Sequence, residues 1–279
     1  MVQVITADYS NLNLRGIHAD FWRGFPDVTG KRVFIKPNLV CPATNYDYWS
    51  TTRVEVVEMV IKKIKRGNPS EIIIGECGFK GQWQNTIKST GYDRLADIPG
   101  VRLVALQDGE NYHKFTLQRL PEGMYRSLFG VKFSDYLLES DVVINIPKMK
   151  VHTMAGITGS IKNMMGTMAQ KGNMHPRGSI EILHKRLADL YSLTRKMVHF
   201  IVMDGITGCE YAEQSGVPID SGVLISGTDQ WEVDVAAAKL MGVNPSQIEY
   251  LRYIRRDWDS VPVPGELIRK YELPLSYRK

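Results

Sequence analysis

The stretch Asp141-Val-Val-Ile-Asn-Ile146, followed directly by Pro147, decides the fold of this chain. Its apolar, mostly β-branched residues stand next to one another instead of alternating with polar ones, which is typical of a strand buried on both faces. Pro147 has no N–H to donate to a sheet ladder, so the strand is predicted to end there. A strand covered on both faces indicates a sheet with helices on each side.

Runs of the same kind recur along the chain and are separated by helical patterns. Further strands are expected at Gln3–Ala7, Arg32–Ile35, Glu71–Gly75, Arg102–Leu106, His199–Asp204 and Gly222–Ser226. Helices are expected at Thr52–Lys65 and Ser179–Met197, where apolar residues recur three or four positions apart, and at Trp231–Met241. This alternation predicts an α/β fold whose central sheet is largely parallel or mixed, with helices on both faces.

The 279 residues contain no linker rich in Gly, Ser or Pro that would divide them. We therefore expect a single α/β domain spanning 1–279, with an arrangement in two lobes as the alternative. The segment near 108–131 is polar and irregular, and it is interpreted as an insertion into this domain.

Composition excludes several classes of protein. Hydrophobic residues make up 43% and charged residues 23%, as in ordinary globular proteins. No apolar run approaches the roughly 20 residues of a membrane helix, and the N-terminus lacks a secretory signal, so a cytoplasmic location is expected.

The net charge of +5 comes from scattered cations, which favours a small anionic ligand over nucleic acid. A homo-oligomer is compatible with the sequence.

The three cysteines, Cys41, Cys77 and Cys209, lie far apart and form no C-x-x-C pair. An iron–sulfur cluster usually takes four cysteine ligands, so no such cluster is expected. The glycine motifs that bind ATP or NAD are also absent. We therefore predict no tightly bound organic cofactor, and no motif supports a metal site.

Three basic side chains follow the strand at Asp141–Ile146, at alternate positions. Lys148, Lys150 and His152 alternate with Met149 and Val151, so an extended chain points all three to one face. Two neighbouring ammonium groups are expected to keep His152 neutral, which makes it a candidate base. We interpret His152, Lys148 and Lys150 as catalytic residues, with an exposed basic loop as the structural alternative.

Two nearby segments complete this candidate site. Thr158 lies between glycines, and Ser160 is expected to cap a helix whose first turn carries Lys162 and Asn163, where backbone N–H groups favour anions. Lys36 and Asn38 follow a buried strand, and ligands bind at the carboxyl ends of such strands.

Neighbouring strands in one sheet would bring these two segments within reach of a common ligand. We therefore predict that Lys36, Lys148, His152 and Lys162 converge on one pocket.

Two aspartates stand at similar boundaries. Asp204 ends a buried strand and Asp229 precedes a helix, so each is a candidate substrate-binding carboxylate, or else a turn or cap residue. His184 lies on the helix after Ser179, and its spacing does not decide whether it faces a site or solvent. The predicted substrate-binding residues are Lys36, Asn38, Thr158, Lys162, Asn163, Asp204 and Asp229.

Several motifs, in order along the chain, resemble those of the domain-of-unknown-function 362 family. They are Ile35-Lys-Pro-Asn-Leu39, Pro147-Lys-Met-Lys-Val-His-Thr153, Gly156-Ile-Thr-Gly-Ser-Ile-Lys-Asn-Met-Met-Gly166, Asp204-Gly-Ile-Thr-Gly208 and Gly227-Thr-Asp229. The chain looks like a short form that lacks the cluster-binding ferredoxin module of many members. The family is distantly similar to the nickel-dependent lactate racemase superfamily. The segment Cys209–Gly216 departs from the short Gly-rich turn that is more usual in the family.

Together these residues favour an enzyme that acts on a small or amphipathic anion, a carboxylate or phosphate, by acid–base catalysis. An isomerase, cyclase or lyase fits this set of side chains better than a dehydrogenase does, because the set needs no cofactor. One alternative is a redox enzyme supplied with electrons by an external ferredoxin or a metallocofactor. Another is a non-catalytic protein that binds an anionic ligand or nucleic acid.

Overall fold

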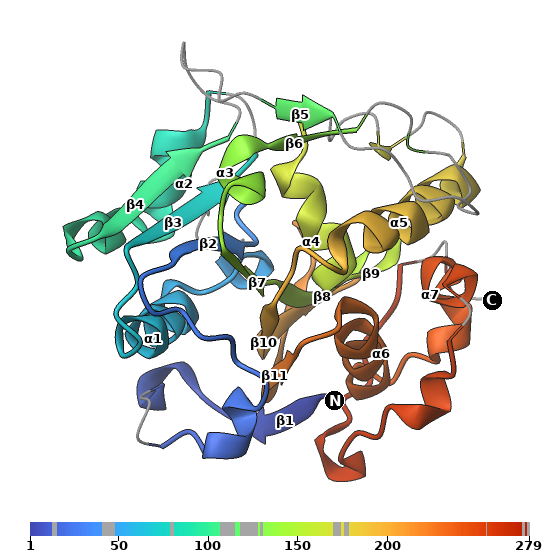
Figure 1. The fold of residues 1–279 in the computed structure, drawn as a ribbon. Helices are drawn as coiled ribbons and strands as arrows, with labels where there is room; N and C mark the ends of the chain where they lie inside the picture. The colour runs from blue at the N-terminus through green and yellow to red at the C-terminus, as the bar shows by residue number, and fades with distance from the viewer. Residues whose placement is uncertain are drawn as a thin grey trace.

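The fold is described from a computed structural model. It describes residues 1–12, 16–40, 48–78, 81–106, 115–117, 128, 131–169, 174–175, 179–254, 256–274 and 277. Within these ranges a mixed sheet runs through the molecule, and helices cover both of its faces (Figure 1). The predicted α/β class is therefore confirmed.

The central sheet has the strand order β1-β11-β10-β7-β2-β3-β4. Its members are β1 (Gln3–Thr6), β2 (Arg32–Pro37), β3 (Glu71–Glu76), β4 (Val101–Ala105), β7 (Val142–Ile146), β10 (Phe200–Glu210) and β11 (Val217–Gly227). In the part of the sheet from β10 through β7, β2 and β3 to β4, each strand is parallel to its neighbour. In contrast, β11 is antiparallel to both β10 and β1. A separate short ladder joins β5 (Phe115–Leu117) to β6 (Lys132–Ser134).

A hairpin continues the sheet beyond the end of β7. After Pro147 the chain forms β8 (Lys148–His152), which pairs with the second half of β10, and β9 (Gly156–Thr158) returns along β8. The last pair between β7 and β2 is Ile146 with Pro37. The β8–β9 hairpin therefore lies past the carboxyl end of β2.

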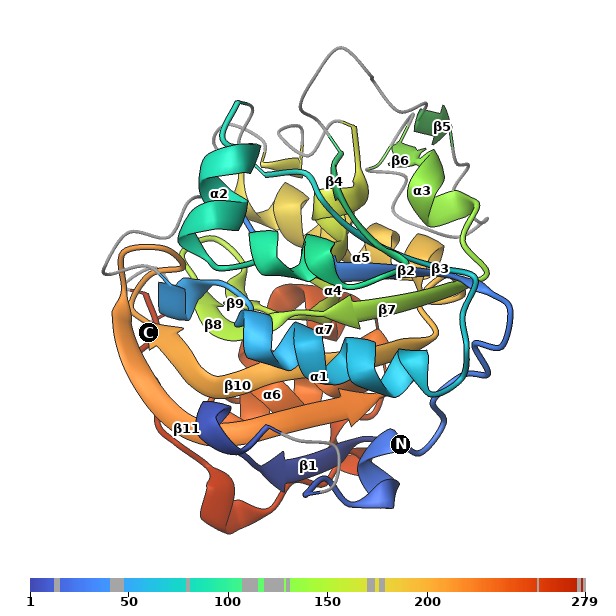
Figure 2. The same ribbon diagram turned by 90° about the vertical axis from the view of Figure 1, so that its left-hand side faces the viewer.

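Helices divide between the two faces of the sheet (Figure 2). The helix α1 (Val54–Lys65) and the shorter α2 (Trp83–Ser89) pack on one face, with the side chains of Val33 and Ile35 from β2. The opposite face carries α3 (Asp135–Leu138), α4 (Ser160–Asn163), α5 (Ile180–Thr194), α6 (Gln230–Leu240) and α7 (Glu249–Tyr253). Alternation along β2 turns Phe34 to that second core.

The ends of two strands differ from the sequence prediction. β10 and β11 run for 11 residues each, well past the expected ends at Asp204 and Gly222. The strand was predicted to end at Asp204, but the register shifts between Gly205 and Thr207, and the strand continues through this bulge. Most of the predicted insertion near 108–131 lies outside the described residues.

A buried residue of β7 should carry a large share of the stability of the sheet. Ile144 has no exposed surface, so Ile144→Ala is expected to lower the free energy of unfolding by about 2–5 kcal/mol through the cavity it leaves. Urea unfolding measures this change. The matched control is Ile182→Ala on α5, where the side chain is 38% exposed and a change within about 0.5 kcal/mol is expected. Equal effects of the two substitutions would contradict the assignment of β7 to the core.

Candidate functional site

A fully buried ion pair joins the carboxyl ends of β2 and β3. The Lys36 Nζ lies 2.6 Å from Glu76 Oε2 and also donates to the carbonyl of Pro37. A longer contact of 3.4 Å joins it to Asn163 Oδ1. These three acceptors match the three N–H groups of the ammonium, which is how a buried charge becomes tolerable. Lys36 therefore stabilises the floor of the site, and its ammonium group is not available to a ligand.

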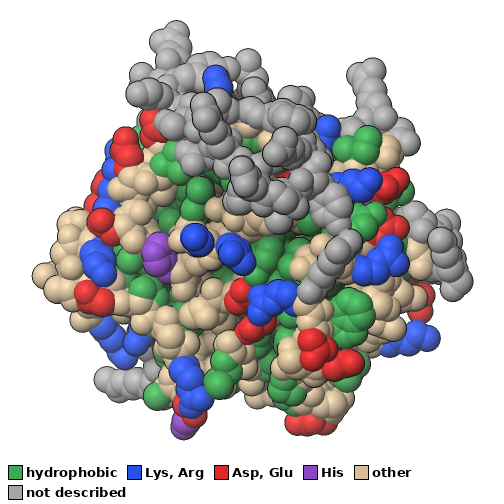
Figure 3. Space-filling view, turned by 45° about the vertical axis from the view of Figure 1, so that its right-hand side comes forward, with side chains coloured by type: hydrophobic (Ala, Val, Ile, Leu, Met, Phe, Trp, Pro, Cys, Tyr) green, Lys and Arg blue, Asp and Glu red, His purple; other side chains and the backbone are tan. Residues whose placement is uncertain are grey.

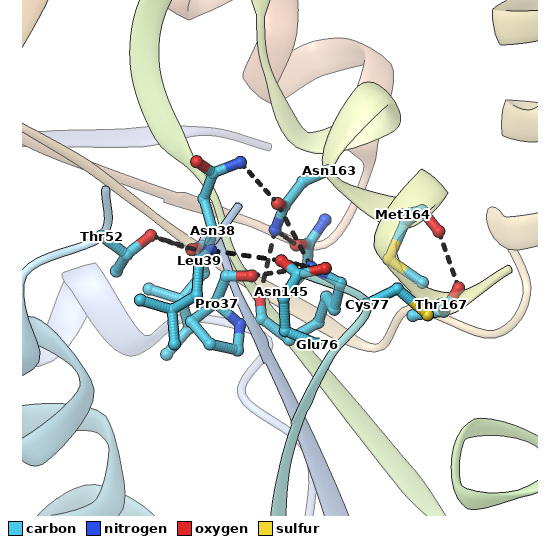
Figure 4. A network of polar contacts seen from close by, with 12 residues as sticks. Pro37, Asn38, Leu39, Thr52, Glu76, Cys77, Asn145, Asn163, Met164 and Thr167 are labelled. Carbon is cyan, nitrogen blue, oxygen red and sulfur yellow. Dashed lines mark hydrogen bonds and ion pairs between the residues drawn. The ribbon is translucent and has the colours of Figure 1, made fainter. Parts of the chain in front are cut away.

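Three asparagine amides continue from this ion pair, and backbone carbonyls fix the orientations of two of them (Figure 4). The Nδ2 of Asn145 donates to the Ser160 carbonyl, so its Oδ1 faces Asn163. The Nδ2 of Asn163 donates to that oxygen and to the Lys36 carbonyl, which leaves Asn163 Oδ1 as an acceptor. Asn38 donates its own Nδ2 to this acceptor at 3.0 Å. The amide oxygen of Asn38 is therefore the last group in this series of hydrogen bonds.

A small pocket opens at this end of the sheet, with a volume of about 140 Å³. Its described lining residues are Asn38, Val40, Glu76, Cys77, Thr158, Lys162, Asn163, Met165, Gly166 and His175. Two buried polar atoms in this lining, Asn38 Oδ1 and Thr158 Oγ1, have no hydrogen-bond partner among the described residues. Leaving such an atom unpaired costs about 1–3 kcal/mol, so the pocket is suited to a polar ligand that pairs with both.

Gly166 lets the chain pass directly over the ion pair. A Cβ at this position would lie 1.9 Å from Glu76 Oε1 and 2.7 Å from Lys36 Nζ. The backbone carbonyl of Gly166 accepts from the N–H of Cys77, which ties the 3-10 turn Met164–Thr167 to the end of β3. A side chain here would push this turn away and open the floor of the pocket.

The short helix α4, which carries Lys162 and Asn163, is held by a carboxylate from α6. Asp234 accepts from the backbone N–H groups of Ser160 and Ile161 and from the hydroxyl of Tyr250. Ser160 was expected to be the cap, but the helix begins at Ser160, and the cap position is Gly159. A Cβ on Gly159 would meet Asp234 Oδ1 at 2.2 Å, so this glycine makes room for the carboxylate.

His152 lies beside the pocket, and its two ring nitrogens have different surroundings. Its Nδ1 accepts from the backbone N–H groups of Met154 and Ala155, each at 3.1 Å. Its Nε2 lies 3.6 Å from Glu213 Oε1, and its ring stacks on that of His175 at 5.8 Å. Burial, with Lys162 as the next largest cause, holds the pKa of His152 well below its usual value. His152 is therefore a neutral ring with its hydrogen on Nε2.

Lys148 and Asp204 form a second buried cluster, on the face that α1 covers. Lys148 Nζ lies 2.8 Å from Asp204 Oδ2 and donates to the hydroxyl of Tyr9. Asp204 also accepts from Tyr9, from the N–H of Ile206 and from the N–H of Arg53 just before α1. Burial lowers the pKa of Lys148, although Asp204 opposes this. The structure thus separates Lys148 from Lys36 and Lys162.

The remaining predicted residues have partners elsewhere. Lys150 shares a face of β8 with Lys148 and His152 and donates to the Ser50 carbonyl at 2.6 Å. Asp229 caps α6 through the N–H of Glu232 and pairs with Arg256. The structure gives Asp229 the role of a helix cap, the alternative that the sequence left open.

His184 also has a structural place. Its Nδ1 accepts from the N–H of Tyr250, and its Nε2 bonds to the hydroxyl of Tyr277. Burial lowers its pKa to about 4.

Sequence reasoning missed three residues of the pocket that carry reactive groups. Glu76 could have been found, because it ends a buried strand in the same way as Lys36. Cys77 follows it and was interpreted only as a core thiol. His175 lies in a segment without periodic pattern, so no signal in the sequence indicated it.

Surface and metal features bear on the other predictions. Acidic and basic side chains are interspersed on the face shown in Figure 3. Within the described ranges no helix combines the length and apolar character that crossing a bilayer requires. The same residues include no cluster of three or more His, Cys, Asp and Glu side chains placed to hold a metal ion. The cofactor predictions stay predictions.

Breaking the second buried cluster should cost stability and leave the pocket intact. Lys148→Met leaves the Asp204 carboxylate buried without its cation, so the free energy of unfolding should fall by about 3–5 kcal/mol. The control is Lys185→Met, which breaks a surface pair with Glu181 and should cost less than about 1 kcal/mol. Urea unfolding measures both. A stable Lys148→Met protein with lost anion binding would instead place Lys148 in the pocket.

Asp234 should make stability depend on pH. Burial raises its pKa to about 7 in the folded chain, against about 3.9 in an unfolded one. Because the folded pKa is the higher one, the stabilising contribution is full below pH 4 and is lost as the pH rises through 7. The free energy of unfolding should therefore fall over this range by up to about 4 kcal/mol more in the wild type than in Asp234→Asn. Urea unfolding at pH 4.5, 6 and 8 measures the free energy of unfolding of both proteins. The same change with pH in the wild type and in Asp234→Asn would refute this prediction.

Comparisons with known proteins give a curated relative and a solved structure that are similar to this chain. A curated relative, the thylakoid-associated protein sll1697 of Synechocystis sp., is 24% identical over 226 residues, covering 78% of this chain. This chain spans 65% of that relative's length. The lactate racemase apoprotein of Thermoanaerobacterium thermosaccharolyticum matches 86% of this chain and 56% of its own, with 12% identity and a TM-score of 0.49.

A family model described as "Domain of unknown function (DUF362)" matches residues 33–239, which is most of the chain. The resemblance stated from the motifs is thereby confirmed. The chain belongs to the DUF362 family.

Proposed function

We propose that this chain is an enzyme that binds a small anion carrying a hydrogen-bond donor and moves a proton on it. The observation that carries the proposal is the pocket at the ends of β2 and β3. Its lining combines the cation Lys162 with two unpaired buried polar atoms, Asn38 Oδ1 and Thr158 Oγ1. Ligands of α/β proteins bind at such strand ends.

The pocket volume limits the size of the ligand. About 140 Å³ is close to the cavity of about 150 Å³ that holds one benzene molecule, so a ligand of roughly six heavy atoms fits. Small carboxylates and inorganic phosphate are of this size. Lys162 supplies the positive charge, because it is among the described residues that line the pocket.

The hydrogen-bonded series of asparagine amides determines which further group the ligand must carry. Because Asn38 presents its oxygen to the pocket, the ligand must offer an O–H or N–H there. The Thr158 hydroxyl rotates freely, so it can donate to an anionic oxygen of the same ligand. These requirements describe a small carboxylate with a hydroxyl or amino group nearby.

The reaction proposed is proton transfer, of the isomerase, cyclase or lyase type. Such a step needs a positioned group that accepts a proton and a cation that stabilises developing negative charge. His175 lines the pocket with an imidazole, a type of group that can accept a proton, and Lys162 is the cation.

A pair of probes that differ in one hydroxyl group tests the amide assignment. Glycolate should bind at least about tenfold more tightly than acetate, because only glycolate offers a donor to Asn38 Oδ1. Isothermal titration calorimetry at low ionic strength measures both affinities. In Asn38→Leu the preference should disappear. Equal binding of the two anions to the wild type would contradict the proposed ligand class.

The anionic part of the ligand is tested separately. Lys162→Ala should weaken the binding of glycolate by at least about tenfold, and added salt should shrink this difference. Lys62→Ala removes a cation from the last turn of α1 and should leave the affinity unchanged. An affinity that responds to neither substitution, or equally to both, would exclude Lys162 as the anion-binding cation.

A further inference from the structure

A second cleft lies between the beginning of α5 and the turn that leads into α7, two helices that lie side by side (Figure 1). Its volume is about 450 Å³, against about 140 Å³ for the pocket at the ends of β2 and β3, and no described residue lines both. Binding sites for small molecules commonly have volumes of about 300–1,000 Å³. The second cleft is therefore large enough for a ligand of its own.

Hydrogen bonds hold the two walls of this cleft and its floor together. Burial lowers the pKa of His184 on α5 to about 4, so its ring is neutral at physiological pH. Its Nδ1 accepts from the N–H of Tyr250 on α7 at 3.2 Å, which places the ring hydrogen on Nε2. That nitrogen donates to the hydroxyl of Tyr277, a lining residue, and this hydroxyl donates to the carbonyl of Met154. The cleft is thus preformed, as ligand sites usually are.

Two side chains of opposite charge line the cleft from α7. Glu249 and Arg252 stand three residues apart, which brings them to the same side of the helix. Within the part of the chain that the structure describes, neither side chain makes a hydrogen bond or an ion pair. The lining carboxylate from α5, Glu181, instead pairs with Lys185 at 2.7 Å. The cleft therefore presents one unpaired cation and one unpaired carboxylate.

The chemistry of these groups determines which ligand fits them. The guanidinium of Arg252 is always charged, and its planar set of N–H donors matches a carboxylate. The carboxylate of Glu249 accepts hydrogen bonds and attracts a cationic donor such as an ammonium group. Ile180, in the first turn of α5, lines the same cleft with 41% of its surface exposed. Covering that surface with an apolar group is favourable by about 25 cal/mol per Å².

We propose that this cleft binds a free α-amino acid with an apolar side chain, such as leucine. The carboxylate of the amino acid pairs with Arg252, its ammonium group pairs with Glu249, and its side chain covers Ile180. An α-amino acid carries both charges on one carbon atom, so it can bridge two groups that lie about one helical turn apart. Leucine is larger than the ligand of about six heavy atoms that the first pocket accommodates, so the two sites take different ligands.

Three probes that differ in their charged groups test this site. Isothermal titration calorimetry of the whole chain compares L-leucine with leucinamide, which lacks the carboxylate, and with 4-methylpentanoate, which lacks the ammonium group. Leucine should bind at least about tenfold more tightly than either of them. Arg252→Gln should remove its advantage over leucinamide, and Glu249→Gln its advantage over 4-methylpentanoate. The matched control is Arg195→Gln, which removes an exposed arginine just after the far end of α5 and should leave the affinity unchanged.

Several results would overturn the proposal. They are the absence of measurable leucine binding, equal binding of the three probes, and an effect of Arg195→Gln as large as that of Arg252→Gln. Lys162→Ala distinguishes the two sites, because it should leave the leucine affinity unchanged. Leucine binding that is lost in Lys162→Ala but not in Arg252→Gln would place leucine in the first pocket and exclude the second site. Failure of glycolate to bind would overturn only the proposed function, and the leucine measurements would still stand.

Discussion

The cation of Lys36 has no exposed surface, and its burial constrains most of the surrounding structure. A buried ammonium needs a counter-charge and an acceptor for every N–H, since the desolvation cost is otherwise several kcal/mol. The end of β3 provides the carboxylate of Glu76, and Asn163 and the Pro37 carbonyl provide the rest. Two strands and α4 must therefore keep their relative positions, and position 166 must be glycine to leave room for the pair.

The same constraint determines the chemistry of the pocket. Because Asn163 turns its oxygen to Lys36, it can accept from Asn38 but cannot donate to it. Asn38 must then present an oxygen, and the pocket gains an acceptor that selects for a donor on the ligand. On the other side, the turn after β8 uses the Nδ1 lone pair of His152, which accepts from two backbone N–H groups. In both cases a backbone group fixes the orientation of a side chain, and the side chain fixes what the ligand meets.

The fold could be predicted from sequence because continuous β-branched runs such as 141–146 leave few alternatives to buried strands. The candidate site was harder, because it depends on register. Lys36 pairs with Asn145 across β2 and β7, and alternation then turns Lys148 to the opposite face, towards Asp204. The sequence does not contain this pairing, and a slip of one residue would have brought Lys36 and Lys148 together. Asn38, Thr158, Lys162 and Asn163 were found because strand ends and glycine-flanked turns mark such positions. His175 has no comparable mark.

We propose that one ligand pairs both with Lys162 and with the unpaired amide oxygen of Asn38. A crystal structure of the protein soaked with glycolate tests it most directly. Electron density is expected in the pocket at the ends of β2 and β3, with the carboxylate towards Lys162 and Thr158 and the hydroxyl within hydrogen-bond distance of Asn38 Oδ1. Glycolate bound instead against Lys148 and Asp204, or in the pocket with its hydroxyl turned away from Asn38, would contradict it.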